Sequence, residues 1–584
     1  MKKVDYESAG VLPRPSILVV VRAMLPAALL LWATQAAATP CEGLTALVLP
    51  DTTITIAQSV PAGSFKAPNG QVITNLPAFC RVHGVSTPTS DSNINFEVWL
   101  PASTWNGRYR QLGSSGFGGA IMFSGRGLLA LADSLRAGYA AASTDDGHVD
   151  PTFVNASWAL GHPQKIVDFA YRALKETTDG AKAVIIAYYG RGPDHSYFAG
   201  CSEGGREALM EAQRFPEDFD GILVGDPASY LADNAVAFAW DEQALTTNPI
   251  AFLPPSKLPA LTQAALKHCA AHEGLGTDPF LNDPRDCDFD PSAILCTGVD
   301  SNNCLTAVQV DAVRKIYSGP IDRRTGKSVF PGLEPGAEAT AASDGAGGWA
   351  SWLDTTPGAG LYPLSFGVWA YMAADDPNFD IYTVKFPEDF AVIEDAPVGD
   401  ETLAAVVDAT NPNLRLFERH GGKIIHYHGW ADAVIPPRSS INYYESVIAN
   451  QRGKVRDDDR KRSLEETREF YRLFMAPGMV HCIGGPGPNA FGVSPGAPPP
   501  VEDAEHDAML ALVQWVEEGI APYKIIATHY VNHNPSQGVD MQRPLCPYPE
   551  VAQYAGTGDT TDAANFTCVG DERHRDDADD HSRR

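Results

Sequence analysis

The chain has much less positive than negative charge. Its 584 residues include 44 Lys and Arg against 72 Asp and Glu, which gives a formal net charge of −28 at pH 7. Such an acidic excess repels polyanions at long range, so the composition disfavours nucleic acid and anionic lipid as partners. We therefore expect a substrate that is neutral or is held by local contacts.

Long apolar segments are scarce as well. The one marked apolar run, at 23–33, follows several basic residues and precedes a stretch of small ones. This pattern is typical of a signal peptide over residues 1–39, with cleavage near Ala38, and predicts a secreted or periplasmic protein. A membrane anchor is the alternative, but Arg22 and Pro26 interrupt its apolar length. No later segment has the apolar length of a membrane span, so we expect none in the mature chain.

The cysteines lack any Cys-x-x-Cys pair, which argues against a metal-thiolate site. All ten lie beyond the expected signal peptide, and an even count in an exported chain favours disulfides. The sequence alone does not fix their pairing, although three pairs of neighbours are spaced to close short loops. The cysteines are Cys41, Cys80, Cys201, Cys269, Cys287, Cys296, Cys304, Cys482, Cys546 and Cys568.

No internal repeat is present, and the composition excludes disordered and collagen-like classes. With 44% hydrophobic and 20% charged residues, the chain can bury at least one large core. The segment 571–584 is the exception, because it is highly charged and almost without apolar residues. We expect it to be a disordered tail.

Strand-like and helix-like segments alternate on both sides of a long irregular region. The order of strand, turn, helix and strand predicts an α/β fold with a parallel sheet flanked by helices. The expected strands are 94–100, 109–112, 196–199, 221–225, 423–428 and 471–475, and the expected helices are 166–189, 206–215, 440–449 and 508–519.

The irregular region begins after Asp226. In it Pro, Gly and Asp become frequent, and it contains four cysteines. A loop of this length is uncommon inside a compact domain, so we interpret 227–415 as an inserted lid domain. The two parts of the α/β domain are then 40–226 and 416–570.

A candidate nucleophile lies in Gly200-Cys201-Ser202-Glu203-Gly204, between an expected strand and an expected helix. G-x-S-x-G in this context predicts the nucleophile elbow of an α/β-hydrolase fold, in which glycines flank a strained serine. The N–H of Glu203, at the start of the helix, is the expected oxyanion donor. An ordinary serine in a turn is the alternative.

A serine hydroxyl needs a histidine as base, and the histidine needs a carboxylate to orient it. Asp432 and His481 follow strands at the sheet edge where such sites assemble, and in the order that this fold requires. The rival acids are Asp408 and Asp395, and the rival bases are His420, His426, His428 and His506.

Cys482 directly follows the candidate base, as Cys201 directly precedes the candidate nucleophile. A bridge between them would hold Ser202 beside His481 and supply the proximity that proton transfer needs. This symmetry favours His481 over its rivals.

Cys201-Ser202, Asp432 and His481-Cys482 resemble the CS-D-HC constellation of the tannase and feruloyl esterase family, which also contains bacterial hydrolases of mono(hydroxyethyl) terephthalate. Further similar stretches are 105–108, 113–119, 143–148 and 429–437. The family pattern implies the bridges Cys41–Cys80, Cys201–Cys482, Cys269–Cys287, Cys296–Cys304 and Cys546–Cys568. It also implies that the loop 113–119 supplies the second oxyanion donor, around Gly116.

The resemblance implies a structural calcium ion in the lid, but the sequence departs from the family's calcium loop. Only Glu273 and Asp278 remain as carboxylates between Cys269 and Asp278. Calcium prefers a cluster of oxygen ligands, so two alternatives stay open: a calcium ion held by Glu273 and Asp278, or a loop held by Cys269–Cys287 alone. No cofactor is expected for catalysis.

A second departure concerns the substrate. Ala370 stands where relatives commonly carry an arginine that grips a substrate carboxylate, which argues against a terephthalate monoester. The resemblance implies a feruloyl or galloyl ester, as a small molecule or linked to a polysaccharide. Lid aromatics that either stack on its ring or belong to the lid core are Trp349, Trp352, Tyr362 and Trp369. The alternatives are a terephthalate-monoester hydrolase, another esterase, lipase or peptidase of this fold, and a catalytically silent secreted binding protein.

Overall fold

The computed structural model describes residues 38–570 apart from short internal segments. Those segments are 126–127, 274, 276, 323–324, 341–346, 354–359 and 452–456, and the side chains of 270–273 and 457–459 are likewise not described. The expected tail 571–584 and all but the last two residues of the expected signal peptide lie outside the described residues, so both stay predictions. None of the described helices has the length and apolar character that a membrane crossing requires.

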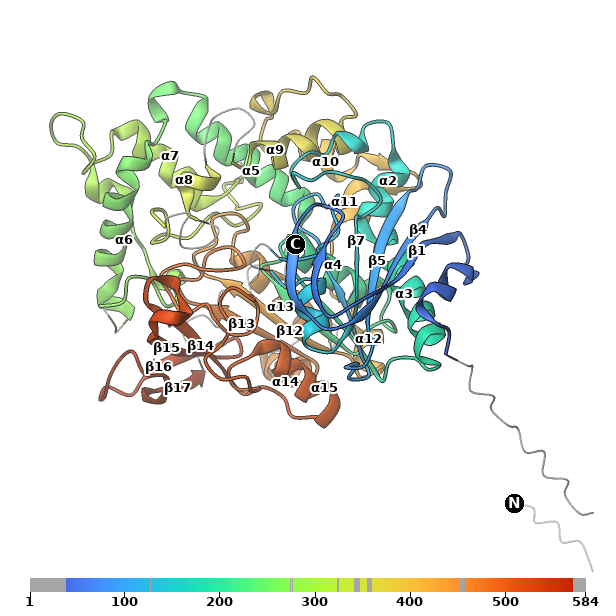
Figure 1. The fold of residues 1–584 in the computed structure, drawn as a ribbon. Helices are drawn as coiled ribbons and strands as arrows, with labels where there is room; N and C mark the ends of the chain where they lie inside the picture. Colours follow the sequence, from blue (N-terminus) through green and yellow to red (C-terminus); the bar gives the residue numbers. More distant parts are fainter. Residues whose placement is uncertain are drawn as a thin grey trace, which may run out of the picture. The chain divides into compact units, whose positions relative to one another are not determined.

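A nine-stranded sheet forms the centre of the fold, in the order β1-β4-β5-β7-β6-β8-β9-β12-β13 (Figure 1). From β7 to β13 neighbouring strands are parallel, as the sequence predicts, whereas β1, β4, β5 and β7 pair antiparallel. The strands are β1 (Thr52–Val60), β4 (Phe79–Ser86), β5 (Ile94–Pro101), β6 (Arg108–Leu112), β7 (Ala140–Thr144), β8 (His195–Cys201), β9 (Gly221–Gly225), β12 (Lys423–Gly429) and β13 (Tyr471–Ala476).

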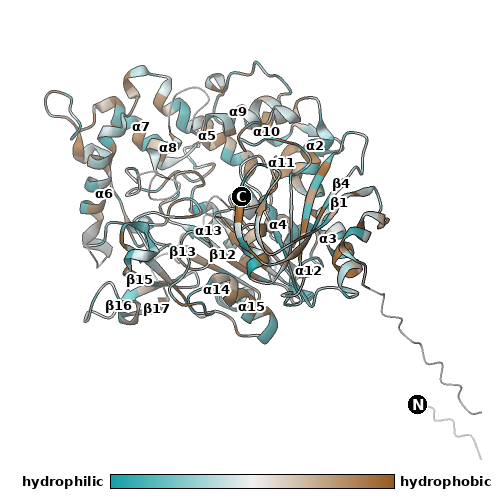
Figure 2. Ribbon diagram, in the orientation of Figure 1, coloured by the Kyte–Doolittle hydropathy of each residue, from teal (hydrophilic) through white to brown (hydrophobic). Residues whose placement is uncertain are grey.

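Successive residues of the inner strands enter two different cores, because side chains alternate across a sheet. Phe198 and Ile222 pack with the helices α3, α4 and α13 on one face. Tyr197 and Leu223 pack with α15 on the other face. Both brown and teal residues occur along α15, as expected for a helix with one face on the sheet (Figure 2). These helices are α3 (Ala173–Tyr189), α4 (Glu203–Arg214), α13 (Arg438–Asn450) and α15 (Ala508–Glu518).

The region between β9 and β12 contributes no described strand to the central sheet and builds much of a separate hydrophobic cluster, which supports an inserted lid. It is coloured green to yellow in Figure 1. The bounds of the lid as a domain stay predictions. Its helices include α5 (Leu231–Thr246), α6 (Leu258–Glu273), α7 (Ala307–Ser318), α8 (Trp349–Trp352), α9 (Tyr362–Phe366), α10 (Phe390–Glu394), α11 (Leu403–Val407) and α12 (Arg415–Arg419).

Several elements differ from the sequence prediction. The helix expected at 166–189 starts earlier, as α2 (Pro163–Val167), and continues into α3 through a π-helical segment, Asp168–Arg172. Helix α14 (Asp457–Arg468) precedes β13. Beyond α15 lie two antiparallel pairs that the hydrophobic pattern does not indicate: β14 (Ile525–Tyr530) with β15 (Val539–Leu545), and β16 (Glu550–Tyr554) with β17 (Phe566–Gly570).

An unusual feature of the interior is its buried carboxyl groups. Burial raises the pKa of Asp145 and of Glu207 to about 7, and it raises the pKa of Asp408 to about 8. Desolvation disfavours the charged form of a carboxyl, so these groups hold a proton near neutral pH that they would lose in the unfolded chain.

We expect the free energy of unfolding to fall as the pH rises from about 5 to 8. In this window the native state binds more protons than the unfolded state, whose carboxyls titrate near pH 4, and stability then decreases with pH. Asp408→Asn removes one of these titrating carboxyl groups, and the asparagine side-chain oxygen can still accept from the N–H of Ala232. Chemical denaturation at several pH values should give a slope shallower by up to about 1.4 kcal/mol per pH unit.

Asp290→Asn is the matched control. Hydrogen bonds from Ser292 and then from Arg314 lower the pKa of exposed Asp290 to about 2, so it titrates below this window. Its slope between pH 5 and 8 should equal that of the wild type. An unchanged slope in Asp408→Asn would contradict the buried-proton explanation.

Candidate active site

Ser202 lies in a strained turn between β8 and α4, with a φ of 65°. The glycines around it are required by close backbone approaches. A Cβ at Gly200 would lie 2.3 Å from the carbonyl oxygen of Gly204, and a Cβ at Gly205 would lie 2.3 Å from that of Gly225. A strained serine held at the end of a parallel strand by small neighbours is the geometry of a nucleophile elbow.

Backbone hydrogen bonds tie this turn to the next strand. The N–H of Ser202 donates to the carbonyl of Gly225 at 3.0 Å, and the N–H of Ala228 donates to the carbonyl of Ser202 at 3.1 Å. Since Ala228 precedes α5, the first lid helix starts close to the candidate nucleophile.

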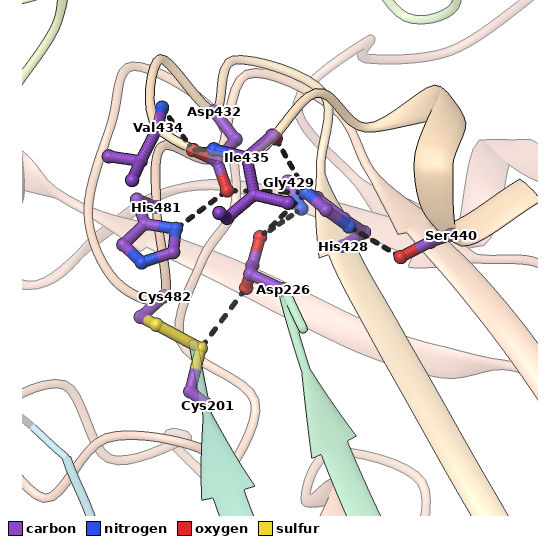
Figure 3. The surroundings of a disulfide bond; sticks show 10 residues. All are labelled: Cys201, Asp226, His428, Gly429, Asp432, Val434, Ile435, Ser440, His481 and Cys482. Carbon is purple, nitrogen blue, oxygen red and sulfur yellow. Dashed lines mark hydrogen bonds and ion pairs between the residues drawn. A yellow bond between two sulfur atoms is a disulfide. The ribbon is translucent and has the colours of Figure 1, made fainter. Parts of the chain in front are cut away.

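Asp432 and His481 meet at the ends of β12 and β13 (Figure 3). The Nδ1 atom of His481 lies 2.7 Å from Oδ2 of Asp432. The other oxygen, Oδ1, accepts from the N–H groups of Val434 at 2.7 Å and Ile435 at 3.0 Å. Asp432 therefore caps its own turn with one oxygen and holds His481 with the other.

A disulfide joins the residues next to Ser202 and His481 (Figure 3). Cys201 and Cys482 are bonded, with their Cα atoms 5.9 Å apart. The bridge connects the end of β8 to the loop after β13, so it brings together two segments that are 281 residues apart. The structure contains this bridge and the four others that the resemblance implies, which together use all ten cysteines.

Charge and burial set the ionisation of this pair. Burial lowers the pKa of His481, but the charge and hydrogen bond of Asp432 and then the charge of Asp226 raise it by more, so the net pKa is raised. For Asp432 burial raises the pKa, and His481 and His428 lower it well below its usual range. Asp432 is thus an anion that stabilises a protonated His481.

Asp226 and His428 are parts of the site that the sequence analysis did not assign to it. Asp226 directly follows β9; its Oδ1 accepts from the N–H of Gly429 at 2.8 Å, and its Oδ2 lies 3.4 Å from Sγ of Cys201. The Nε2 atom of His428 lies 3.2 Å from Asp432 and 3.6 Å from Asp226. A strand-end position like that of Asp432 is the one signal in the sequence that points to Asp226.

A chain of buried hydrogen bonds fixes the tautomer of His428. Its Nε2 faces acceptors only, the two carboxylates and the carbonyl of Ile435 at 3.1 Å, so the proton lies there. Its Nδ1 lies 2.6 Å from the hydroxyl oxygen of Ser440. His426 continues the chain, between Ser440 at 2.9 Å and Tyr471 at 2.7 Å. Each of the four ring nitrogens of the two imidazoles has a hydrogen-bond partner.

The remaining rival residues lie elsewhere. His420 pairs with Glu217, and His506 pairs with Asp503. Among the acids, Asp408 accepts from the N–H of Ala232 at the start of α5, and Asp395 is exposed. None of these four is among the described partners of His481.

Glu203 and Gly116, the two expected oxyanion donors, line one pocket together with Ser202. Glu203 is the first residue of α4, where a backbone N–H has no acceptor within the helix. Gly116 has a φ of 57°, and a Cβ there would lie 1.9 Å from the carbonyl oxygen of Phe153. Only glycine fits so close to the backbone of Phe153. This close contact helps to hold the loop beside the elbow.

The loop that carries Gly116 is fastened to α4. The two carboxylate oxygens of Glu207 accept from the N–H and from the hydroxyl of Ser114, at 2.8 and 2.7 Å. The N–H of Gly204 donates to the carbonyl of Ser114 at 3.2 Å. The loop and the elbow are therefore held as one rigid unit, as preorganised donors require.

The four lid aromatics lie in three different surroundings. Trp349 and Trp369 are buried in the lid core, and the indole N–H of Trp369 donates to the carbonyl of Ala235. Tyr362 stacks on Phe366. Trp352 packs edge-on against His481, with ring centres 6.3 Å apart, so it alone of the four lies beside the candidate base.

The expected calcium ligands do not form a described cation site. Asp278 accepts from the guanidinium of Arg543, with both carboxylate oxygens at 3.1 Å. The side chain of Glu273 lies outside the described residues. An adjacent guanidinium repels a cation and neutralises the carboxylate, so Asp278 does not fit a calcium ligand. Calcium stays a prediction for Glu273.

The comparisons with known proteins agree with this geometry. A family model described as tannase and feruloyl esterase matches residues 80–569. An uncharacterized esterase of Xanthomonas campestris pv. campestris is 45% identical over 546 residues, covering 92% of this chain and 93% of its own. The mono(2-hydroxyethyl) terephthalate hydrolase of Piscinibacter sakaiensis is 31% identical over 550 residues, covering 85% of each chain. The crystal structure of feruloyl esterase B from Aspergillus oryzae has a TM-score of 0.78 at 29% identity, covering 91% of this chain and 99% of that one.

We expect the double variant Cys201→Ala/Cys482→Ala to lose reactivity at Ser202. Removing the bridge frees the His481 loop, and misplacing a base by about 1 Å costs on the order of 100-fold in rate. The rate at which a fluorophosphonate labels Ser202 measures this loss in protein that is still folded. The melting temperature should fall too, since a native disulfide contributes about 2–5 kcal/mol.

Cys546→Ala/Cys568→Ala is the control, because this bridge links β15 to β17 and none of the site residues. It should lower the melting temperature while leaving the labelling rate unchanged. Equal labelling by both double variants would show that the Cys201–Cys482 bridge does not position the base.

Proposed function

The chain belongs to the tannase and feruloyl esterase family and is a carboxylic ester hydrolase, and we propose that it cleaves esters of phenolic acids with Ser202, His481 and Asp432 as its catalytic residues. One observation carries the assignment of these residues. The His481–Asp432 hydrogen bond lies at one end of a disulfide whose other end adjoins the strained Ser202.

In the first half of the reaction, the Oγ atom of Ser202 attacks the ester carbonyl carbon while its proton passes to Nε2 of His481. Asp432 holds the opposite nitrogen and stabilises the imidazolium that forms. The carbonyl oxygen becomes an oxyanion and accepts from the N–H groups of Glu203 and Gly116. When the C–O bond to the alcohol breaks, the leaving oxygen takes the proton from His481 and the acyl group stays on Ser202.

In the second half, a water molecule replaces the alcohol. His481 takes a proton from the water, whose oxygen attacks the acyl carbon through a second oxyanion in the same position. Collapse of this intermediate returns the proton to Ser202 and releases the carboxylic acid. After the two halves Ser202 and His481 are back in their starting protonation states, and no cofactor takes part.

The substrate class rests on the pocket next to Ser202. Apart from the elbow, most of its lining is apolar and comes from the lid helix α5, the segment 364–368 and the loop 434–435. None of its lining residues is Lys, Arg or His, and Ala370 is fully buried. A free carboxylate would therefore enter without a counter-charge, which is costly. The pocket favours a neutral aromatic acyl group over a terephthalate monoester.

Relatives support this choice of substrate. One of them is named a probable feruloyl esterase B-1, from Aspergillus oryzae, and is 30% identical over 507 residues. Five disulfides also favour an oxidising compartment, so we propose that the enzyme is exported.

We expect Ser202→Ala to abolish hydrolysis of methyl ferulate and methyl gallate, with a loss of about 10⁶-fold in kcat. The same variant should resist fluorophosphonate labelling. Ser439→Ala is the matched control, since Ser439 is a buried serine outside the machinery and its loss should leave turnover unchanged. Turnover that persists in Ser202→Ala would refute the nucleophile, and a wild type that cleaves only the terephthalate monoester would refute the substrate class.

We expect kcat/KM to rise with pH through the pKa of His481, because only the neutral imidazole accepts the serine proton. Since the pKa of His481 is raised, the midpoint of this acid limb should lie above about 6.5. Asp226→Asn removes a negative charge that raises this pKa, so the midpoint should move to lower pH. The asparagine oxygen can still accept from Gly429, which keeps the geometry. A pH–rate profile with an unmoved midpoint would exclude Asp226 from the electrostatics of the base.

A further inference from the structure

The pocket next to Ser202 contains one polar side chain that the catalytic machinery does not use. Beyond Ser202 and Glu203 at the elbow, its lining residues are apolar except for Asn234. Asn234 is 1% exposed, and neither its side-chain oxygen nor its side-chain nitrogen has a hydrogen-bond partner among the described residues.

Helix α5 places Asn234 in the wall of the pocket that also contains Ser202. The lining residues Leu231, Asn234 and Phe238 recur at three- and four-residue spacing, so they lie on one face of the helix. The helix starts three residues after Ala228, which is hydrogen-bonded to Ser202. Asn234 is the fourth residue of α5, green in Figure 1, and lies about 4.5 Å along the helix axis beyond Leu231 and about 6 Å before Phe238.

The pocket lies on the acyl side of the ester. Its lining includes both proposed oxyanion donors, Glu203 and Gly116, but not His481, which must reach the leaving alcohol. Trp352 lies against His481 and is likewise not in the lining. The acid part of the substrate therefore extends along α5, with its carbonyl at the elbow.

An unpaired buried amide is costly to the free protein. Leaving a buried donor or acceptor without a partner costs about 1–3 kcal/mol. Such a group in an otherwise apolar pocket is explained when a ligand supplies the missing partner, because polar groups of this kind fix orientation and give specificity.

We propose that Asn234 recognises the phenolic hydroxyl of the acyl group. This assignment rests on the proposed function. The amide offers a donor and an acceptor without charge, which matches a hydroxyl that can both donate and accept. A carboxylate offers only acceptors and carries a charge that the pocket does not neutralise. An unsubstituted ring leaves the amide unpaired.

The test compares two esters that differ only in the hydroxyl, methyl 4-hydroxycinnamate and methyl cinnamate. The wild type should favour the hydroxylated ester by roughly tenfold or more in kcat/KM, as expected for a hydrogen bond lost inside a closed site. Asn234→Leu keeps a similar volume and removes the amide, so it should reduce this preference to about one. Its melting temperature should stay the same or rise, since a buried unpaired polar group is removed.

Leu364→Met is the matched control in the same pocket. It changes the shape of an apolar wall without altering a hydrogen bond, so it should change kcat/KM for both esters by the same factor. An Asn234→Leu variant that keeps the wild-type preference, or that loses rate equally on both esters, would overturn the role of Asn234. A wild type that hydrolyses neither ester would instead refute the proposed function, so the two failures are distinguishable.

Discussion

The site depends on one covalent bond between two distant parts of the chain. A parallel sheet brings the carboxyl ends of β8, β9, β12 and β13 to one edge, but strand pairing alone leaves the loops at that edge free to move. The Cys201–Cys482 bridge removes this freedom next to the proposed nucleophile and the proposed base, Ser202 and His481. The close approaches at Gly200 and Gly205 fix the nucleophile's side of the bridge, and the Asp432 hydrogen bond fixes the side of the base.

Burial gives this arrangement its electrostatic character. In a dry interior an isolated carboxylate becomes protonated, as the raised pKa values of Glu207 and Asp408 illustrate. Asp432 behaves in the opposite way, because two backbone N–H groups and two imidazoles surround it. His428 contributes to this difference in pKa, because its Nε2 donates to Asp432. Its Nδ1 is hydrogen-bonded to Ser440, which in turn is hydrogen-bonded to His426. Together these partners hold the pKa of Asp432 well below its usual range.

The sequence predicts those features that have local signals. The elbow around Ser202 combines a motif with a strand and a helix, and the cysteines next to Ser202 and His481 single out the base. The parallel strands β6, β8, β9, β12 and β13 are also predicted from their sequence patterns. The antiparallel strands β1 and β4 and the C-terminal pairs are set by contacts between distant segments, which periodicity does not reveal. His428 looks like any histidine in a strand, since its role depends on Asp226 and Ser440 from other elements. The ion pair of Asp278 likewise depends on Arg543, from a distant strand.

Asn234 shows the same limit for specificity. In the sequence it is a polar residue of the irregular region 227–415, and an exposed position is the ordinary expectation for an asparagine. In the structure Asn234 lies on α5 in the wall of a largely apolar pocket, and its amide loses its partners in water without gaining any among the described residues. A leucine there would make the free enzyme more stable, because an apolar group carries no desolvation penalty. The amide lowers the free energy of unfolding of the empty enzyme. In return it can form a hydrogen bond with the acid when the acid is bound. The hydrolase core therefore determines which bond is cleaved, and the lid determines which acid is admitted.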